Sequence, residues 1–334
     1  MDNRNGVRRR IKGATIRGNT INNSGAAGIF LYKASLFTVA DNVVYRSWAD
    51  GIHVTAGSAD GRIVKNAVSQ NGDDMVAIVS YAGDRKAVGM ATRYNVMSSD
   101  EMDDNIYIAQ NHLTDTYWGR GISVVGGTDV TIENNEISRT PTCAGIYLLR
   151  ESSYLSFGDR NILVQQNSIS QVQTLPPTYK PPNLDLVLTH HGAIEISSQM
   201  DSQEFADPNV RSQLSVAGIA ILNNTIQNAR FAAMRFGAVS RSDNTTGSLV
   251  VSGNTLNEVG VDSIAAIYPG LDRTSLSCSQ NTLNGQVWAS QCDKGTAPGT
   301  SAVNVTGSFL ECKADGTLTR GHAPNPPGSF RIHQ

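Results

Sequence analysis

Residues 107–137 read YIAQNHLTDTYWGRGISVVGGTDVTIENNEI and contain the unit on which the fold depends. In this unit an alternating apolar stretch leads to an Asn, a polar residue and an aliphatic residue. The unit occurs nine times, with its Asn at positions 19, 42, 66, 111, 135, 167, 224, 254 and 281. The spacings of 23, 24, 45, 24, 32, 57, 30 and 27 residues indicate a repeat of about 24 residues.

A second pattern, Gly-Ile-x-aliphatic, lies between the Asn units at 28–31, 51–54, 121–124 and 145–148. Side chains that alternate in this way are typical of short strands. A repeat of about 24 residues with several strands leaves no room for a crossover helix. The sequence therefore predicts an all-β fold, a right-handed parallel β-helix of about 9–11 coils. We expect the Asn residues to stack at a turn, because Asn tolerates left-handed geometry and bonds local backbone.

Composition excludes several classes of protein. The chain of 334 residues is 40% hydrophobic, which is enough for a core, and its net charge of −2 argues against nucleic-acid binding. No apolar run is long enough to span a membrane, and no signal peptide is visible, although we predict a secreted or periplasmic protein. We expect the solenoid to occupy residues 1–291 and a C-terminal cap and tail 292–334. Because the first coil begins without a polar cap, we also expect further sequence upstream, or a trimmed chain.

The repeat is interrupted by four predicted insertions, at 82–104, 151–160, 172–192 and 199–215. They flank one column of strands, and long loops on a rigid scaffold usually carry function. We therefore expect them to form the walls of a cleft. The residues predicted to line it and to bind substrate are His53, Tyr81, Arg120, Tyr147, Arg150, His191 and Glu195.

Three carboxylates fall at the start of neighbouring strands in this column. Asp50 and Asp74 are one period of 24 residues apart, and Asp73 adjoins them. Stacked coils place equivalent residues about 4.8 Å apart, so the negative charges should raise at least one pKa. A protonated carboxyl beside ionised ones is what glycosidic bond cleavage requires. A Ca²⁺ site and simple turn-forming Asp residues are the competing interpretations.

The sequence around these residues resembles a known family. ADGIHV at 49–54 and GDDMVAI at 72–78, followed by GRGISVVGG at 119–127, are similar to the signatures of the polygalacturonase-like β-helix hydrolases, glycoside hydrolase family 28, within the pectin-lyase-like β-helix superfamily. Those signatures run roughly NTDGxxV, GDDCIAI and GHGxSxGS. The catalytic match covers only residues 48–127, whereas the wider resemblance to the superfamily covers most of the chain.

The resemblance implies a role for each carboxylate: Asp73 is the general acid, and Asp50 and Asp74 hold and deprotonate the attacking water, which gives inversion. The chain departs from the signatures at Trp48, which replaces Asn, and at Met75, which replaces Cys. Arg120 replaces the signature His, and the later Arg-Ile-Lys triplet has no clear copy. These departures weaken the expectation of a galacturonan substrate.

Three functions remain open from the sequence. The first is an inverting glycoside hydrolase that uses the three Asp residues, with a polysaccharide or oligosaccharide substrate and no cofactor. The second is a polysaccharide lyase or epimerase on the same fold, which would use His53, Tyr147 and Arg150 and could require Ca²⁺. The third is a non-catalytic glycan-binding or tail-fibre β-helix.

Overall fold

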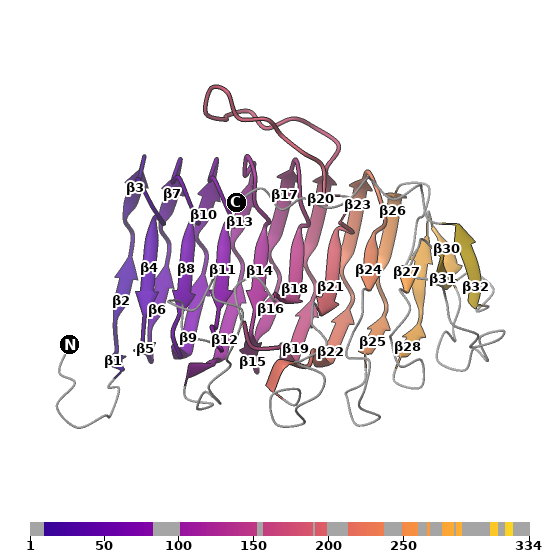
Figure 1. Ribbon diagram of the computed structural model, residues 1–334, viewed down its shortest axis with the longest axis horizontal. Coiled ribbons are helices and arrows are strands. Elements are labelled where there is room, and N and C mark those ends of the chain that lie inside the picture. Colours follow the sequence, from indigo (N-terminus) through magenta and orange to yellow (C-terminus); the bar gives the residue numbers. More distant parts are fainter. Residues whose placement is uncertain are drawn as a thin grey trace, which may run out of the picture.

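The computed structural model describes residues 10–82, 101–151, 156–189, 191–198, 213–236 and 249–259, and further short segments, mostly strands, between 266 and 322. Three sheets run along a rod, and each coil contributes a strand to each sheet (Figure 1). The predicted all-β parallel β-helix is confirmed. Within the described residues, the structure holds no helix of sufficient length and apolarity to traverse a membrane.

Sheet A consists of twelve short strands. They are β1 (Ile11–Lys12), β2 (Thr15–Arg17), β5 (Ala34–Ser35), β6 (Thr38–Ala40), β9 (Ala59–Val64), β12 (Asp103–Ala109), β15 (Gly127–Thr128), β16 (Thr131–Glu133), β19 (Arg160–Gln165), β22 (Ala217–Leu222), β25 (Leu249–Ser252) and β28 (Leu276–Ser279).

Sheet B contains the strands that follow each repeated Asn. They are β3 (Thr20–Asn22), β7 (Val43–Tyr45), β10 (Ala67–Ser69), β13 (His112–Thr114), β17 (Glu136–Thr140), β20 (Ser168–Val172), β23 (Thr225–Ala229), β26 (Thr255–Val259), β29 (Asn281–Leu283) and β30 (Gln286–Trp288). The last strand, β30, folds back antiparallel onto β29.

Sheet C contains the strands of the Gly-Ile pattern. They are β4 (Ile29–Tyr32), β8 (Ile52–Thr55), β11 (Val76–Val79), β14 (Ile122–Val125), β18 (Ile146–Arg150), β21 (Ile194–Ser198), β24 (Met234–Phe236), β27 (Ala266–Ile267), β31 (Ser308–Cys312) and β32 (Leu318–His322). The pairing is parallel from β4 to β27, and β31 and β32 add antiparallel strands at one edge.

The core is a column of aliphatic side chains inside the rod. In sheet C, Ile52, Val76 and Ile122 lie in register and are fully buried. Their alternate neighbours His53 and Ser123 face outward, as strand geometry requires. Because every coil repeats this alternation, each coil contributes apolar groups at the same positions, and the core is continuous along the rod.

The repeated Asn residues form a hydrogen-bonded ladder along the rod. The side-chain Nδ2 of Asn19 donates to Oδ1 of Asn42 at 2.9 Å, and the same bond recurs at 2.9–3.0 Å through Asn66, Asn111, Asn135, Asn167, Asn224 and Asn254 to Asn281. Each Oδ1 also accepts the backbone N–H of the preceding Asn. The ladder therefore satisfies buried polar groups at the same turn of every coil.

The expected left-handed conformation falls one residue earlier than the ladder. At this turn the residue with positive φ is the one before the ladder Asn, for example Asp41 at 55°, Lys65 at 57° and Gln110 at 57°. The chain turns sharply at that preceding residue. The ladder Asn is thereby free to point its amide inward, where it can reach the next coil.

The predicted insertions lie beside sheet C. Three of them separate a sheet C strand from the next sheet A strand, and residues 172–192 connect β20 to β21. Residues 83–100, 152–155, 190 and 199–212 lie outside the described residues. The boundary predicted at 104 is wrong, because β12 already begins at Asp103 and Asp104 pairs with Ala59 and Thr128. The boundary at 160 is also shifted, since Arg160 begins β19. Much of the region predicted as cap and tail, 292–334, is likewise outside the described residues.

Asp103 is a buried carboxyl at the turn into sheet A. Its Oδ1 accepts the backbone N–H of Ser58 at 2.7 Å, whereas Oδ2 is buried without a hydrogen-bond partner. Burial raises the pKa of Asp103 from 3.8 to about 8. The unfolded chain loses this proton near pH 4 and the folded chain near pH 8, so the free energy of unfolding should fall as the pH rises between these values.

Asp103→Asn should therefore remove most of that pH dependence, because the amide does not titrate in this range, while its oxygen can still accept from Ser58. Urea titrations at several pH values should show a variant that is more stable than the wild type by roughly 2–4 kcal/mol at pH 8.5. A wild-type stability that does not change between pH 5 and pH 8.5 would contradict this expectation.

Candidate active site

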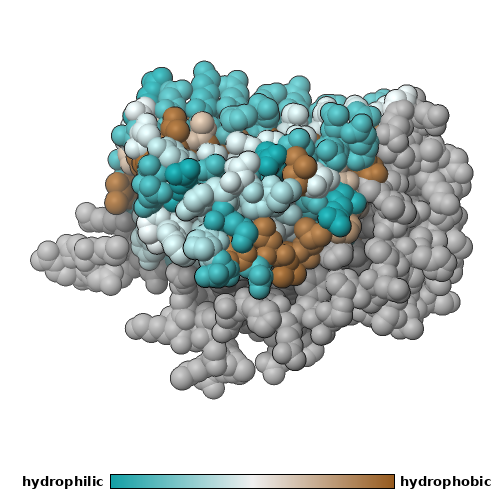
Figure 2. Space-filling model, turned by 90° about the horizontal axis from the view of Figure 1, so that it is seen from above, coloured by the Kyte–Doolittle hydropathy of each residue, from teal (hydrophilic) through white to brown (hydrophobic). Residues whose placement is uncertain are grey.

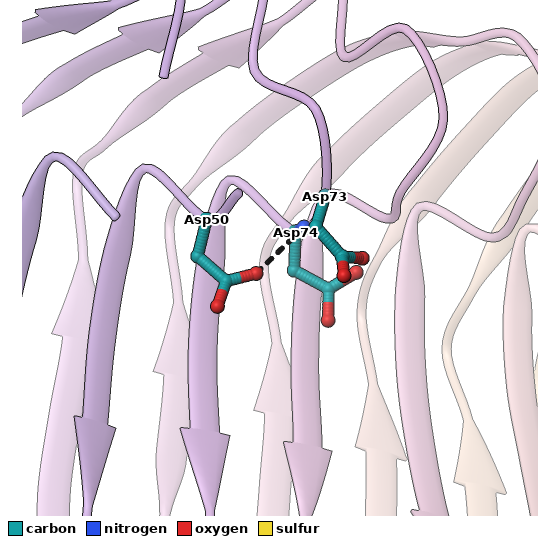
Figure 3. Close-up of side chains that lie close together, drawn as sticks. All are labelled: Asp50, Asp73 and Asp74. Atoms are coloured by element: carbon teal, nitrogen blue, oxygen red, sulfur yellow. Dashed lines mark hydrogen bonds between the residues drawn. The ribbon is translucent and has the colours of Figure 1, made fainter. Parts of the chain in front are cut away.

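The three Asp residues lie at the start of neighbouring strands in sheet C. Asp50 precedes β8 by two residues and Asp74 precedes β11 by two, and the pairing of Ile52 with Val76 places them on adjacent coils. The backbone N–H of Asp74 donates to Oδ1 of Asp50 at 2.9 Å (Figure 3). One carboxylate oxygen from each of Asp50, Asp73 and Asp74, hereafter the Asp trio, lies within 4.8 Å of the others.

Two glycines allow the coils to stack closely beside the trio. A Cβ on Gly72 would lie 2.1 Å from the carbonyl oxygen of Trp48. A Cβ on Gly119 would lie 2.1 Å from the carbonyl carbon of Asp73. Neither contact is possible for a residue with a side chain unless the backbone moves, so the spacing of the trio depends on both glycines.

The members of the trio differ in environment. The Asp73 side chain is 41% exposed, whereas those of Asp50 and Asp74 are 13% and 7% exposed. Loss of hydration among the surrounding groups and the negative charges of Asp74 and Asp50 raise the pKa of Asp73 well above its usual value. Burial also raises the pKa of Asp50, and the hydrogen bond from His53 opposes that rise. Asp73 is thus an accessible carboxyl that retains its proton at unusually high pH.

Asp50 and Asp74 are held by hydrogen bonds. Oδ2 of Asp50 lies 2.6 Å from Nδ1 of His53. Oδ1 of Asp74 accepts the backbone N–H of Arg120 at 2.8 Å, and Oδ2 accepts the hydroxyl of Ser123 at 2.5 Å. Both carboxylates are therefore fixed in orientation.

Arg120 is the principal positive group at the trio. Its Nη1 lies 3.4 Å from Asp74 and 3.7 Å from Asp73, and its Nη2 lies 3.4 Å from Glu151. The guanidinium also lies 4.5 Å from the centre of the Tyr147 ring. One positive charge is thus shared among three carboxylates and an aromatic face.

Other predicted binding residues lie around this centre. The ring of His53 stacks on Phe30 at 5.0 Å, and the ring of His191 lies 5.0 Å from that of Tyr147. Tyr147 itself is buried beneath Arg120. Tyr81 forms an isolated bridge with Ser156, beyond the end of β11 and therefore at the far end of that strand from Asp74.

Besides the buried Tyr147, two further predicted binding residues are inaccessible. Arg150 is fully buried, at 0% exposure, and its Nε donates to the carbonyl oxygen of Ser156 at 3.3 Å, so its assignment to substrate binding is wrong. The alternation that points Ile146 and Leu148 inward also points Arg150 inward. Glu195 does lie on the outward side of its strand, but it is only 2% exposed and pairs with Arg235 at 2.8 Å, so it too is unavailable.

The predicted site residues omit two residues of the site. Ser123 is a direct partner of Asp74, and its place two coils from His53 in sheet C was a usable signal. Glu151 follows directly after β18 and contacts Arg120. Nothing in the local pattern indicates that contact, because it depends on the path of Arg120 across Tyr147.

The segment 174–189, hereafter the arm, runs back along the rod from β20 (Figure 1). Its Thr178 donates to Asp115, and its Tyr179 lies 4.9 Å from the Arg46 guanidinium and 6.0 Å from the Tyr117 ring. Tyr117 adjoins Gly72, since a Cβ there would lie 2.4 Å from the Tyr117 hydroxyl. The arm therefore covers the turns that lead into the trio on one side.

Among the described residues, the Asp trio is the group of carboxylates that can approach a metal ion together. Hard cations such as Ca²⁺ prefer such oxygen ligands. However, Asp74 already receives hydrogen bonds from Arg120 and Ser123, and the guanidinium lies within 4 Å of two members. A divalent cation at the trio would have to compete with this resident positive charge, so the residues fit a metal poorly.

Comparison with known proteins identifies the class. A family model described as "Right handed beta helix region" matches residues 1–169, and the chain belongs to this family. No curated protein sequence matches the chain.

Solved structures share the fold at low identity. The A-module of mannuronan C-5 epimerase AlgE6 from Azotobacter vinelandii matches with a TM-score of 0.57 and 16% identity over 81% of this chain and 58% of that chain. The catalytic unit of the GH87 alpha-1,3-glucanase from Streptomyces thermodiastaticus matches with a TM-score of 0.53 and 18% identity. The match covers 84% of this chain and 45% of that chain. A GH87 alpha-1,3-glucanase catalytic domain in complex with tetrasaccharides matches with a TM-score of 0.55 and 17% identity. That match covers 82% of this chain and 45% of that chain. The chain spans about half the length of these structures.

Proposed function

We propose that this protein is a glycoside hydrolase that cleaves a polysaccharide at the Asp trio. The observation that carries the proposal is the approach of three carboxylates within 4.8 Å, one of them accessible and two held by hydrogen bonds. The likeness in fold to carbohydrate-processing enzymes supports the same conclusion. A polysaccharide substrate in turn supports a secreted or periplasmic location.

Asp73 would act as the general acid. It is the most exposed member of the trio, and its pKa is raised well above its usual value, so it retains its proton at unusually high pH. A proton given to the glycosidic oxygen is replaced from solvent after the leaving sugar departs. Arg120, at 3.7 Å, would then stabilise the Asp73 carboxylate that forms.

Asp50 and Asp74 would hold and deprotonate the attacking water. The two catalytic carboxyl groups of inverting glycosidases lie about 6.5–9.5 Å apart, and those of retaining glycosidases about 5–5.5 Å. The oxygens of the trio lie within 4.8 Å of one another, which is nearer to the retaining separation. Yet the oxygens of both Asp50 and Asp74 already accept hydrogen bonds, which weakens either carboxylate as a direct nucleophile. We therefore propose that water attacks and that the product inverts. Proton NMR of the first anomer released tests this step.

The structure offers less support for a lyase or epimerase, which must neutralise a uronate carboxylate and abstract a carbon-bound proton. Arg150 is buried, and Arg120 is already shared among carboxylates. Burial raises the pKa of Tyr147 above its usual value, which disfavours a tyrosinate base. The fold nevertheless resembles that of an epimerase, and for this reason we retain the lyase or epimerase as a second candidate to be tested.

A panel of polysaccharides incubated with the full chain tests the proposed function. Hydrolysis should release new reducing ends without unsaturated sugars, whereas a lyase would also generate an ultraviolet-absorbing unsaturated product. An epimerase would change the sugar composition without shortening the chains. Turnover of no glycan, combined with a stable trimer in solution, would instead favour a non-catalytic fibre.

The pH profile of kcat/KM should be bell-shaped, with both limbs above the ordinary carboxyl range. The rate should fall as rising pH deprotonates Asp73 and as falling pH protonates Asp50. Since the hydrogen bond from His53 lowers the pKa of Asp50, His53→Ala should move the acidic limb to higher pH and leave the alkaline limb in place. An acidic limb that stays unchanged in this variant would argue against Asp50 as the base.

A further inference from the structure

Two exposed tryptophans flank the Asp trio. Trp48 is 67% exposed and Trp118 is 48% exposed. Trp48 lies four residues before Ile52 and Trp118 four residues before Ile122, and both of these isoleucines pair in register with Val76. The two tryptophan residues therefore occupy the same position in the repeat, on coils that are two steps apart.

The coil between the two tryptophans carries a glycine at this position. Gly72 lies four residues before Val76, so this coil presents no side chain at the equivalent position, and the carbonyl oxygen of Trp48 and the hydroxyl of Tyr117 pack against the glycine. Asp73 follows it directly. Two coil steps span about 10 Å, and one sugar ring of an extended polysaccharide is about as long as one step. A chain parallel to the rod axis can therefore place alternate rings on Trp48 and Trp118 and the intervening ring beside Asp73.

The charge at the site selects against an acidic chain. Four carboxyl groups, those of Asp50, Asp73, Asp74 and Glu151, lie at the site, and the Arg120 guanidinium contacts the last three of them. His53 is engaged by Asp50. A uronate carboxylate would have to share the Arg120 guanidinium with these carboxyl groups, whereas the hydroxyl groups of a neutral sugar can donate to them. Viewed from above, the described surface has hydrophobic groups near the middle and a hydrophilic row along one edge (Figure 2).

We propose that the substrate is an uncharged polysaccharide that lies parallel to the rod axis, with alternate sugar rings stacked on Trp48 and Trp118. This inference rests on the proposed hydrolase function and assigns its substrate class.

Affinity electrophoresis with the Asp73→Asn variant of the full chain tests the substrate class without turnover. The gels contain dextran, laminarin, pullulan or mixed-linkage β-glucan as neutral probes, and polygalacturonate or alginate as acidic probes. Alginate with its carboxyl groups reduced to alcohols serves as a matched uncharged chain. We expect retardation by at least one neutral glycan and none by the polyuronates. Retardation by none of these glycans, or stronger retardation by the polyuronates, would overturn the proposal.

The role of the indoles is tested on the retarding glycan. Trp48→Ala and Trp118→Ala should each weaken binding about tenfold, because each removes an aromatic surface that buries a sugar face. Trp48→Phe should recover much of that loss. Tyr107→Ala, an aromatic change on sheet A where Tyr107 contacts Arg62, is the matched control and should bind like its parent. Equal affinities in all four variants would remove the tryptophans from the binding surface.

These outcomes separate the two proposals. If the glycan binds and the tryptophan variants lose affinity, but the wild type never cleaves it, the stacking of sugar rings on the two tryptophans stands and the hydrolase function fails. If the wild type cleaves a polysaccharide and the tryptophan variants keep full affinity and rate, the hydrolase function stands and the proposed stacking on the tryptophans fails.

Discussion

Replacing Asp73 with Asn should lower kcat on the polysaccharide substrate by about 10²–10⁴-fold, the usual contribution of a general acid. The amide has nearly the same shape but cannot release a proton to the leaving oxygen. Because the Asp73 side chain is 41% exposed, the variant should fold and bind substrate with little change in Kd. Initial rates of reducing-end release and affinity electrophoresis measure the two quantities separately.

A second carboxylate provides the control for this prediction. Asp60→Asn makes the same chemical change at an exposed position of β9 on sheet A, where Asp60 accepts a hydrogen bond from Asn105. It should keep the wild-type rate. A residual activity of Asp73→Asn within threefold of the wild type would exclude Asp73 as the acid and reopen the assignment within the trio.

Replacing Asn111 with Ala should lower the free energy of unfolding by about 3–5 kcal/mol. Its side chain accepts from the backbone and the amide of Asn66 and donates to Ile63 and Asn135, so four buried hydrogen bonds disappear together. Each is worth about 0.5–1.5 kcal/mol, and the partners left unsatisfied add to the cost. Urea unfolding followed by circular dichroism measures the loss.

An Asn outside the ladder provides the comparison. Asn22→Ala removes an exposed side chain at the end of β3 and should change stability by less than about 0.5 kcal/mol. If both variants unfold at the same urea concentration, the ladder does not contribute to stability as its geometry indicates.

Much of the fold could be predicted because the coils repeat the same two sequence patterns, the Asn unit and the Gly-Ile segment. The nine Asn positions found in the sequence are the nine members of the ladder, and the Gly-Ile segments are strands of sheet C. The period of 24 residues also brought Asp50 and Asp74 to adjacent coils. Repetition allowed residues far apart in sequence to be placed together without knowledge of long-range packing.

The remaining features depend on interactions that no period encodes. The contact of Arg120 with Tyr147 and Glu151 follows from the rotamer of one long side chain. The path of the arm depends on Tyr179 meeting Arg46, more than 130 residues earlier in the chain. Arg150 is a different case, since strict alternation along β18 predicts its inward direction and its charge wrongly suggested the opposite.

The Asn ladder also gives the rod an electrical direction. In every step the amide nitrogen donates toward the following coil and the oxygen accepts from the preceding one. The nine amide dipoles therefore add head to tail, with the negative end at the first coil and the positive end at Asn281. Hydrogen bonds aligned in this way polarise one another. A substitution near the middle of the row should thus weaken the amide–amide hydrogen bonds several coils away, so that the ladder behaves as one cooperative unit.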